Sequence, residues 1–502
     1  MKLYFQENDF PWSPERYRYA AEQMMLTLFP GEKPEYPADV PHNMAGETNA
    51  AVFTLRRGKK LATVSVRVFR PQSCRCGTRR FPVAELDGAP ERVYHTVQHA
   101  LKLAFYKAGT ALLGYEPPWG ALTGVRPVKL PTRALLSGAT PAQAERELRR
   151  EYRVSPDRAR LAVDCARASV EARRSLGERE VSLYIGIPFC PTRCAYCSFV
   201  SADVGRTLKL VEPYVDALLR EIEAAGRALK EAGLAVRSFY MGGGTPTTLS
   251  PDQMDRILSR CEAALPLAGC TEYTVEAGRP DTVTREKLEV LVRHHVGRVS
   301  VNPQTLEGRV LEAIGRGHTP GDVGRAYALA REAGFGRVNM DLIAGLPRDT
   351  FDGFRRSLEE VLELDPENIT VHTLALKKGS RLMEERGRLP GGEESARMLD
   401  FSRAILTQSG YIPYYLYRQK YMSGSLENVG WAKPGTESLY NIIMMEELHT
   451  VVSLGAGGVT KLIAPGAILR LANPKYPQDY LSGMDKVLGQ KEEIKTFYMP
   501  RS

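Results

Sequence analysis

The sequence contains no long apolar run. No stretch approaches the roughly 18 uncharged apolar residues that a membrane-spanning helix requires. The first eleven residues include acidic side chains and a proline where a secretory signal peptide would have an apolar core. These absences predict a cytoplasmic protein without a membrane span.

Cysteine and histidine are both scarce, with eight of each among 502 residues. So few cysteines in a cytoplasmic chain of this length predict reduced thiols and a metal site, and exclude a disulfide framework. Low-complexity segments and tandem repeats are also absent. The composition is that of an ordinary globular protein, long enough for two or three domains.

Acidic residues are outnumbered by basic ones, and the formal net charge is +9. This positive charge suits a polyanionic partner, such as a nucleic acid, a membrane surface or a substrate with several carboxylates. Charge alone does not distinguish among these partners.

Three of the cysteines, Cys190, Cys194 and Cys197, stand close together with the spacing C-x3-C-x2-C. Four thiolates would close a zinc or iron site, whereas three bind three irons of a cubane [4Fe–4S] cluster and leave the fourth iron open. The alternative is a structural zinc site with a histidine as fourth ligand. Because no histidine lies within ten residues of these cysteines, we favour the cluster.

The residues around the cysteines predict the edge of a sheet. Residues 181–188 form an apolar run that stops at a proline, as a buried parallel strand would. A second run, 237–241, leads into three glycines, which allow a backbone to approach a ligand closely. Active sites of βα folds lie where the strands end, so both segments are expected at one site.

The chain is predicted to have three domains, 1–177, 178–379 and 380–502. The first is expected to be α+β, with a hairpin formed by 51–55 and 61–69 and helices that begin at Ser13, Thr140 and Ser155.

The second domain repeats a strand and a helix, which is typical of a partial (β/α)6 TIM-like barrel, and the third is expected to be mostly helical. The fold class is therefore α/β. The predicted strands are 181–187, 237–241, 271–276, 298–302, 336–341 and 368–374, and the predicted helices are 212–230, 251–265, 283–293, 307–333 and 350–363.

Polar residues lie at or after the ends of the predicted strands, at Glu276, Gln304, Arg316 and Asp341. A single acid at such a place is more often a helix cap or a member of a surface ion pair. As a set they suit a polar ligand, because Arg pairs with a carboxylate in a fork and a carboxylate accepts hydroxyl or amino groups.

Together these motifs resemble the radical S-adenosylmethionine (SAM) superfamily, and within it the oxygen-independent coproporphyrinogen III oxidase family. The resemblance covers 181–460, and the segment 119–129 is similar to the coproporphyrinogen dehydrogenase branch. It implies a barrel of the radical SAM type, a [4Fe–4S] cluster on the three cysteines, and one bound SAM. The family also implies a second SAM molecule. Further matching segments are 274–277, 298–306, 315–319, 339–347, 368–374 and 433–441.

The resemblance also implies the residues that contact SAM. Tyr196 would lie against the adenine, and Tyr184 would join the three cysteines in the catalytic group. The implied cofactor-binding residues are Tyr184, Tyr196, Gly243, Gly244, Thr245, Glu276, Gln304, Arg316, Asp341 and Ala375.

The activity implied is the oxidative decarboxylation of coproporphyrinogen III to protoporphyrinogen IX in anaerobic haem biosynthesis. An electron from the cluster would cleave SAM, and the resulting radical would take a β-hydrogen from a propionate, which loses carbon dioxide and becomes a vinyl group. The implied partners are the tetrapyrrole substrate, whose carboxylates suit a basic protein, and an electron donor such as a flavodoxin or ferredoxin.

Two departures from the family leave alternatives open. The best-defined oxidases have a fourth cysteine where this chain has Phe199, and a histidine where it has Gly186. The first departure is shared with haem chaperones, so a haem carrier is an alternative, as is another radical SAM enzyme that modifies tetrapyrroles. A carrier would need an axial ligand, for which the available residues are His294, His295, His318, His372 and His449.

An RNA-modifying radical enzyme would use the positive charge, but no recognisable RNA-binding module is present, and a nucleic-acid partner is not expected. Cys74 and Cys76 are interpreted as loop cysteines, because two thiols are too few for a cluster. The aromatic segment 411–418 either walls a tetrapyrrole pocket or forms a half-buried strand. The remaining cysteines, Cys165, Cys261 and Cys270, are expected in the core.

Overall fold

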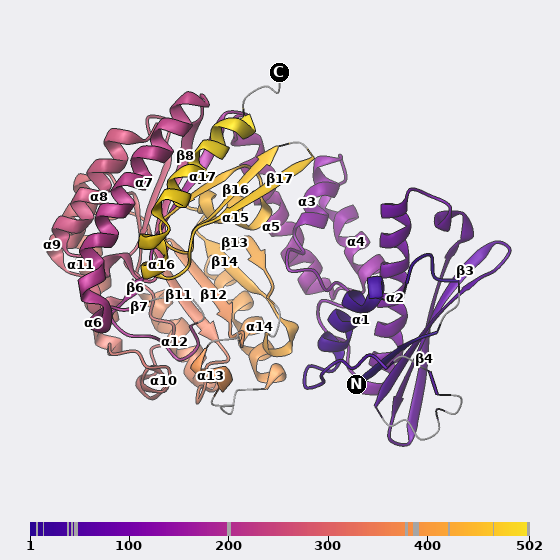
Figure 1. Cartoon of the computed structure of the whole chain (residues 1–502). Helices are drawn as coiled ribbons and strands as arrows, with labels where there is room; N and C mark the ends of the chain where they lie inside the picture. Colours follow the sequence, from indigo (N-terminus) through magenta and orange to yellow (C-terminus); the bar gives the residue numbers. More distant parts are fainter. Residues whose placement is uncertain are drawn as a thin grey trace. The chain divides into compact units, whose positions relative to one another are not determined.

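The structure is a computed structural model, and its described chain divides into two compact units (Figure 1). The three-domain division of the sequence stays a prediction. Unit 1 consists of Met1–Pro127, Ala139–Ala162 and Gln419–Leu426, and unit 2 of Val128–Gly138, Val163–Arg418 and Glu427–Ser502. The structure describes residues 1–498 apart from 7–8, 14, 38–39, 42–43, 45–48, 198–201, 377–379, 385–390, 420–421 and 465.

Unit 1 is built on a four-stranded sheet of order β1-β2-β3-β4, in which β1 runs parallel to β2 and the other pairs are antiparallel. Alternate valines of β3 are fully buried with residues of α1 and α2 in one apolar core. The predicted hairpin is confirmed, because it is the pair β2 and β3. The strands are β1 Lys2–Phe5, β2 Ala50–Arg57, β3 Leu61–Arg70 and β4 Ser73–Pro82, and the first helices are α1 Glu15–Leu28 and α2 Pro90–Leu113.

The strand β4 corrects one interpretation of the sequence. Cys74 and Cys76 were interpreted as loop residues, but both lie on β4, opposite Phe69 and Arg67 of β3, and both are exposed. Arginines and a glycine hide the strand pattern of β4 in the sequence, and its pairing with β3 decides its conformation.

Two helices of the N-terminal region begin where their caps predict. Thr140 accepts a hydrogen bond from the Gln143 amide, and the Gln143 side chain accepts one from the Thr140 amide, which is a capping box at the start of α4. Cys165 is buried in α5, as expected for a core thiol. These helices are α3 Lys129–Leu136, α4 Pro141–Tyr152 and α5 Pro156–Ser175.

Unit 2 contains an 11-stranded sheet of order β13-β14-β12-β11-β10-β9-β8-β5-β15-β16-β17. Its centre is the six parallel strands β5 Glu180–Ile187, β8 Ala235–Gly243, β9 Glu272–Glu276, β10 Arg298–Ser300, β11 Val338–Ala344 and β12 Asn368–Thr373. All six match predicted strands. Figure 1 shows α7, α8, α9 and α11 on the outer side of this sheet.

The prediction of one helix over 307–333 is wrong, because the structure has two helices in this range. α10 ends at Ala313, Gly315 has φ +72°, and α11 begins at Pro320 after the cap residue Thr319. Gly in a left-handed conformation ends a helix, and Pro at the first position begins one. The helices around the barrel are α7 Val211–Glu231, α8 Pro251–Ala264, α9 Arg285–Arg293, α10 Gly308–Ala313, α11 Pro320–Glu332 and α12 Phe351–Glu363.

The C-terminal region adds strands to both edges of the sheet. β13 and β14 extend it antiparallel beside β12, and β15 pairs in parallel with β5. Residues 411–418 therefore include a strand with buried aromatic side chains, Tyr414 and Tyr415. The elements are β13 Ile412–Tyr417, β14 Asn428–Ala432, β15 Val451–Leu454, β16 Val459–Ala464, β17 Ala467–Ala472, α13 Arg381–Glu384, α14 Gly392–Gln408, α15 Leu439–Glu446, α16 Pro477–Ser482 and α17 Met484–Tyr498.

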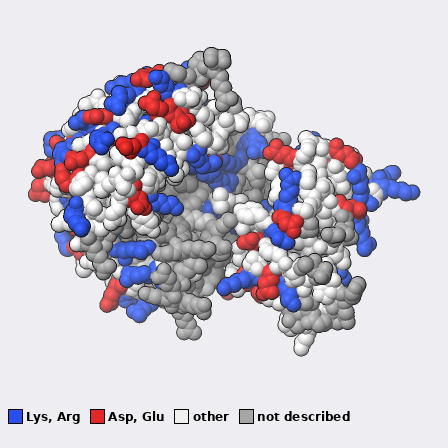
Figure 2. Space-filling model, in the orientation of Figure 1, with Lys and Arg blue, Asp and Glu red and all other residues white. Residues whose placement is uncertain are grey.

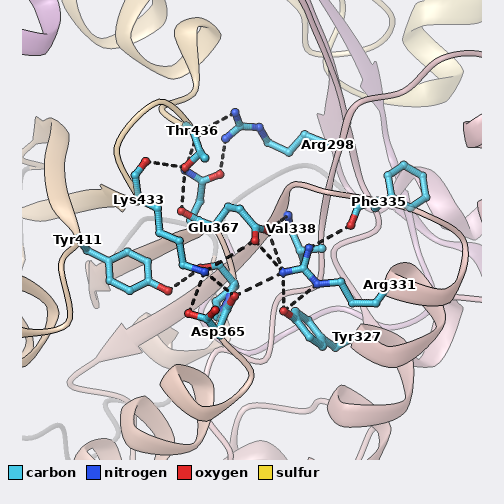
Figure 3. A network of polar contacts seen from close by, with 12 residues as sticks. Arg298, Tyr327, Arg331, Phe335, Val338, Asp365, Glu367, Tyr411, Lys433 and Thr436 are labelled. Carbon is cyan, nitrogen blue, oxygen red and sulfur yellow. Dashed lines mark hydrogen bonds and ion pairs between the residues drawn. The ribbon is translucent and has the colours of Figure 1, made fainter.

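A polar network joins strands and helices at the end of the sheet where β11 and β12 begin (Figure 3). Glu367 accepts hydrogen bonds from the Val338 amide and from Arg331, both at 2.9 Å, and lies 3.8 Å from the Lys433 ammonium.

Within the part of the chain that the structure describes, no helix is both long and apolar enough to cross a membrane.

Candidate functional site

The cysteine segment follows β5 and is anchored through its backbone. Cys190 ends the short strand β6 Phe189–Cys190, which pairs with β7 Ala202–Asp203, just before the helix α6 Val204–Thr207. The Cys197 amide donates to the Cys194 carbonyl at 3.1 Å, and the Ala195 amide donates to Ile314 at 2.9 Å. The three cysteines therefore lie in one loop at the carboxyl end of the first barrel strand.

The glycine turn lies directly against this segment. The Gly244 amide donates to Ile187 at 2.7 Å and the Thr245 amide to Phe189 at 2.8 Å, while the Thr245 hydroxyl lies 3.5 Å from the Cys190 sulfur. A Cβ atom on Gly244 would lie 2.5 Å from the Phe189 carbonyl oxygen, so only glycine fits there. The turn and the cysteine loop thus form one unit.

Glu276 ends β9 and faces β8. Tyr240 of β8 donates a hydrogen bond of 2.6 Å to its carboxylate. Burial raises the pKa of Glu276 to about 7. The nearby Asp341 carboxylate also raises this pKa, whereas the hydrogen bond from Tyr240 lowers it. The carboxyl group is therefore poised to change its charge near neutral pH.

Three tyrosines stack beside this carboxyl. The ring centroids of Tyr240 and Tyr440 are 4.5 Å apart at 18°, and Tyr184 lies 6.3 Å from each of them at 17°. Tyr184 comes from β5, Tyr240 from β8 and Tyr440 from α15. Offset aromatic stacking of this kind holds the rings in place.

Asp341 lies in β11 among polar neighbours. The side-chain amide of Asn339 donates a hydrogen bond of 2.8 Å to the Asp341 carboxylate, and a ring nitrogen of His372 lies 3.7 Å from the same carboxylate. Burial alone would raise the pKa of Asp341, but His372 and Asn339 outweigh burial and hold the pKa below its ordinary value. Glu276 and Asp341 thus differ in their readiness to ionise.

Gln304 and Arg316 complete the polar set. Gln304 has a positive φ of 65°, which is uncommon for a residue other than glycine, and its amide donates to the Asp341 carbonyl at 2.8 Å. Arg316 donates to the Asn302 carbonyl at 2.8 Å and to the Tyr196 hydroxyl at 3.2 Å. Burial opposes the charge of Arg316, but Tyr196 and Cys194 beside it raise its pKa.

The site has the thiols that a cluster needs and the unpartnered polar atoms that a polar cofactor could bond. Among the described residues, no three His, Cys, Asp or Glu side chains could hold one metal ion. Thiolates that bind separate irons of a cubane need not converge on one point. Among the residues of this site, Gln304 Oε1, Asn302 Oδ1 and Arg316 Nε are buried and have no hydrogen-bond partner in the described chain. Such atoms suit a bound polar ligand.

Eight of the ten implied cofactor-binding residues make the contacts described above. Of the other two, Gly243 ends β8. Ala375 lies two residues beyond β12 and is partly buried. Their roles as ligands stay predictions. Sequence reasoning missed Tyr240 and Tyr440. The alternation of Tyr240 with buried Phe239 and Met241 was a usable signal for the first, and the segment 433–441, which matches the family, was one for Tyr440.

Comparison with known proteins identifies the family. Residues 184–361 match the model of the radical SAM superfamily. The oxygen-independent coproporphyrinogen-III oxidase-like protein HemZ of Bacillus subtilis is 40% identical over 401 residues, 78% of this chain and 80% of its own. The heme chaperone HemW of Escherichia coli is 30% identical over 307 residues, 60% of this chain and 76% of its own.

A solved structure agrees with the fold. Coproporphyrinogen III oxidase (HemN) from Escherichia coli, a radical SAM enzyme, matches with a TM-score of 0.51 and 25% identity, over 63% of this chain and 71% of its own. The predicted partial barrel of the radical SAM type is confirmed. A [4Fe–4S] cluster and SAM are the cofactors of such proteins. The chain belongs to the radical SAM superfamily and, within it, to the family of oxygen-independent coproporphyrinogen III oxidase-like proteins.

Proposed function

We propose that this chain catalyses the oxidative decarboxylation of coproporphyrinogen III to protoporphyrinogen IX. The observation that carries the proposal is the meeting of the cysteine loop, the glycine turn and Glu276 at one end of the sheet, with Arg316 beside Tyr196. Relatives named as coproporphyrinogen III oxidases support it, among them one from Pseudomonas aeruginosa that is 32% identical over 240 residues.

In this proposal Cys190, Cys194 and Cys197 hold the cluster. The cluster and SAM, when bound, would supply the radical that abstracts a hydrogen atom from an unactivated carbon, which acid–base chemistry cannot do. Each propionate then loses one hydrogen atom, one carbon dioxide and one electron, so the reaction needs an electron acceptor. An electron donor such as a flavodoxin or ferredoxin would reduce the cluster.

The chain's own residues bind and orient the cofactor. Arg316, held by the Asn302 carbonyl and Tyr196, is placed to pair with a carboxylate. Asp341 keeps its charge, and it suits an ammonium group or the hydroxyls of a ribose. The stacked rings of Tyr184, Tyr240 and Tyr440 offer an apolar surface that would help to exclude water from the substrate carbon that reacts.

A haem carrier is the second candidate, because heme chaperones are among the relatives. Several of the histidines that could ligate haem already have partners. His294 bonds Glu262 at 2.9 Å and Asp255 at 3.1 Å, and His449 bonds Ser182 at 2.8 Å. These two histidines are therefore less suited to ligate haem than His318, whose two ring nitrogens have no hydrogen-bond partner among the described residues. Phe199, which departs from the oxidase pattern, lies outside the described residues.

The experiment is an anaerobic incubation of the cluster-loaded protein with SAM, a reductant and either coproporphyrinogen III or haem. The enzyme should consume SAM and yield first a monovinyl and then a divinyl product, which chromatography separates. Stoichiometric haem binding without a divinyl product, in protein with an intact cluster that cleaves SAM, would favour the carrier and overturn the proposal.

A further inference from the structure

One segment carries an unusual concentration of positive charge. Residues 48–84 contain nine basic side chains and no acidic one, which equals the net charge of +9 of the whole chain. The segment forms β2, β3 and β4 of unit 1. Figure 2 shows Lys and Arg gathered at the end of the β2–β3 hairpin, where β3 is labelled in Figure 1. The nine are Arg56, Arg57, Lys59, Lys60, Arg67, Arg70, Arg75, Arg79 and Arg80.

The two faces of this sheet differ in character. One face buries alternate apolar residues of β3 in the core with α1 and α2. On the other face, the strand register places side chains from β2, β3 and β4 in rows across the sheet. The rows are Arg56, Thr63 and Arg80, then Thr54, Ser65 and Thr78, then Val52, Arg67 and Cys76. A row of hydroxyls therefore lies between two rows that carry arginines.

The arginines divide according to their partners. Arg57 pairs with Asp87 at 2.6 Å, Arg70 with Glu32 at 2.7 Å and Arg79 with Glu151 at 3.3 Å. The three that lie in the rows, Arg56, Arg67 and Arg80, are exposed and have no carboxylate partner among the described residues. The guanidinium of Arg67 lies 5.8 Å from the ring centroid of Phe69. The positive charge of this face is therefore not neutralised by described parts of the chain.

We propose that this face, defined by Arg56, Arg67 and Arg80 with the hydroxyl row between them, binds the phosphate backbone of a single-stranded nucleic acid. Seven of the nine basic residues are arginines, whose planar guanidinium matches a phosphate in a two-pronged contact better than a lysine does. Threonine and serine hydroxyls donate to phosphate oxygens and to sugars.

The shape of the face selects a single strand. Two strand spacings separate Arg56 from Arg80, which is about 10 Å across the sheet. A two-stranded ribbon enters the major groove of a duplex, but a face of three strands is too broad for that groove. Phe69, one row beyond Arg67, is the one aromatic residue that β3 and β4 place on this face, so stacking on bases contributes little and binding should be independent of sequence. This inference is independent of the proposed function, and it departs from the expectation that nucleic acid is not a partner because the sequence contains no recognisable RNA-binding module.

The test measures binding of the full chain to a fluorescein-labelled oligouridylate by anisotropy at several salt concentrations. Three phosphate contacts on a single strand predict a slope of about −2 for log affinity against log salt, which weakens binding roughly twentyfold between about 50 and 200 mM. The combined variant Arg56→Gln, Arg67→Gln and Arg80→Gln should lose at least tenfold in affinity at the lowest salt, and most of the slope.

The matched control removes the same charge elsewhere. Arg133, Arg160 and Arg167 are exposed on α3 and α5, and their combined change to Gln should leave the affinity and slope unchanged. Equal losses in both triple variants, or no binding by the parent chain at the lowest salt, would overturn the proposal. Competition by polyglutamate of equal charge as strong as that by unlabelled oligouridylate would also overturn it, because the face would then suit an acidic protein. Thermal unfolding of each variant checks its fold.

Discussion

Tyr240 donates a hydrogen bond of 2.6 Å to Glu276 across neighbouring strands of the barrel. The same phenol ring stacks on Tyr440, so a residue of the C-terminal region helps to hold the tyrosine that makes this hydrogen bond. This relationship keeps the half-buried carboxyl of Glu276 in a defined position. Desolvation raises the pKa of the same carboxyl to about 7.

The stability of the cofactor-free protein should depend on Glu276. The carboxyl has an ordinary value of 4.5 and a pKa of about 7 in the folded protein, so the folded state holds its proton more tightly. The contribution of the neutral group is complete below pH 4.5 and is lost as pH rises through 7, a change of about 3 kcal/mol. Glu276→Gln stays neutral and should be more stable than the parent above pH 7.

Urea unfolding at pH 5 and pH 8 would measure this difference. Glu360→Gln, a change at an exposed position of α12, serves as the control and should keep the parent's pH dependence. Parallel pH profiles for the parent and Glu276→Gln would show that the carboxyl is not held neutral.

The cluster should depend on three cysteines only. Changing Cys190, Cys194 and Cys197 together to Ala should abolish bound iron and the broad absorbance near ~400 nm of a thiolate-bound cluster. Cys74→Ala and Cys76→Ala, on an exposed strand of unit 1, should retain both signals. Iron content and absorbance after anaerobic reconstitution decide the matter, and full retention of iron by the triple variant would refute the ligand assignment.

Arg316 should matter for SAM and not for the cluster. Its guanidinium is half-buried and held by Asn302 and Tyr196, so Arg316→Gln should weaken SAM binding at least tenfold, as loss of a desolvated charged hydrogen bond does. Calorimetry on the reconstituted protein measures the affinity, and iron content should be unchanged. Arg309→Gln, on the exposed side of α10, should bind SAM like the parent. Equal affinities for both variants would mean that Arg316 does not contact SAM.

Gly244→Ala should disturb the junction of the turn and the cysteine loop. The new Cβ would lie 2.5 Å from a backbone carbonyl oxygen, which cannot move aside as a flexible side chain can. We expect a loss of about 1–3 kcal/mol in stability together with weaker retention of iron. Gly324→Ala in α11 meets no atom within 4 Å and should stabilise its helix slightly. A parent-like iron content and stability for Gly244→Ala would contradict the close approach.

The network around Glu367 should contribute more to stability than an exposed ion pair. Glu367→Ala removes the partner of Arg331 and of the Val338 amide and should cost about 3 kcal/mol, because it leaves polar groups unpaired in a largely buried place. Glu332→Ala breaks the exposed pair with Arg285 and should cost less than about 1 kcal/mol. Urea unfolding compares the two variants, and equal costs would argue against the network.

The sequence by itself determined the local features of this protein. The six central strands were predictable because each buries a short apolar run between capped helices, and the cysteine spacing pointed to a cluster without any structure. The capping boxes of α4 and α8 follow from four adjacent residues each, so they too are local.

Only the tertiary structure decided the contacts between distant segments. Two strands beyond residue 411 join the sheet beside partners that are remote in sequence, β14 beside β12 and β15 beside β5, so their own residues give a weak signal. Tyr440 lies 200 residues from Tyr240 and 256 from Tyr184, yet the three rings stack. The raised pKa of Glu276 has the same origin, because burial and the placement of Tyr240 and Asp341 exist only in the folded chain.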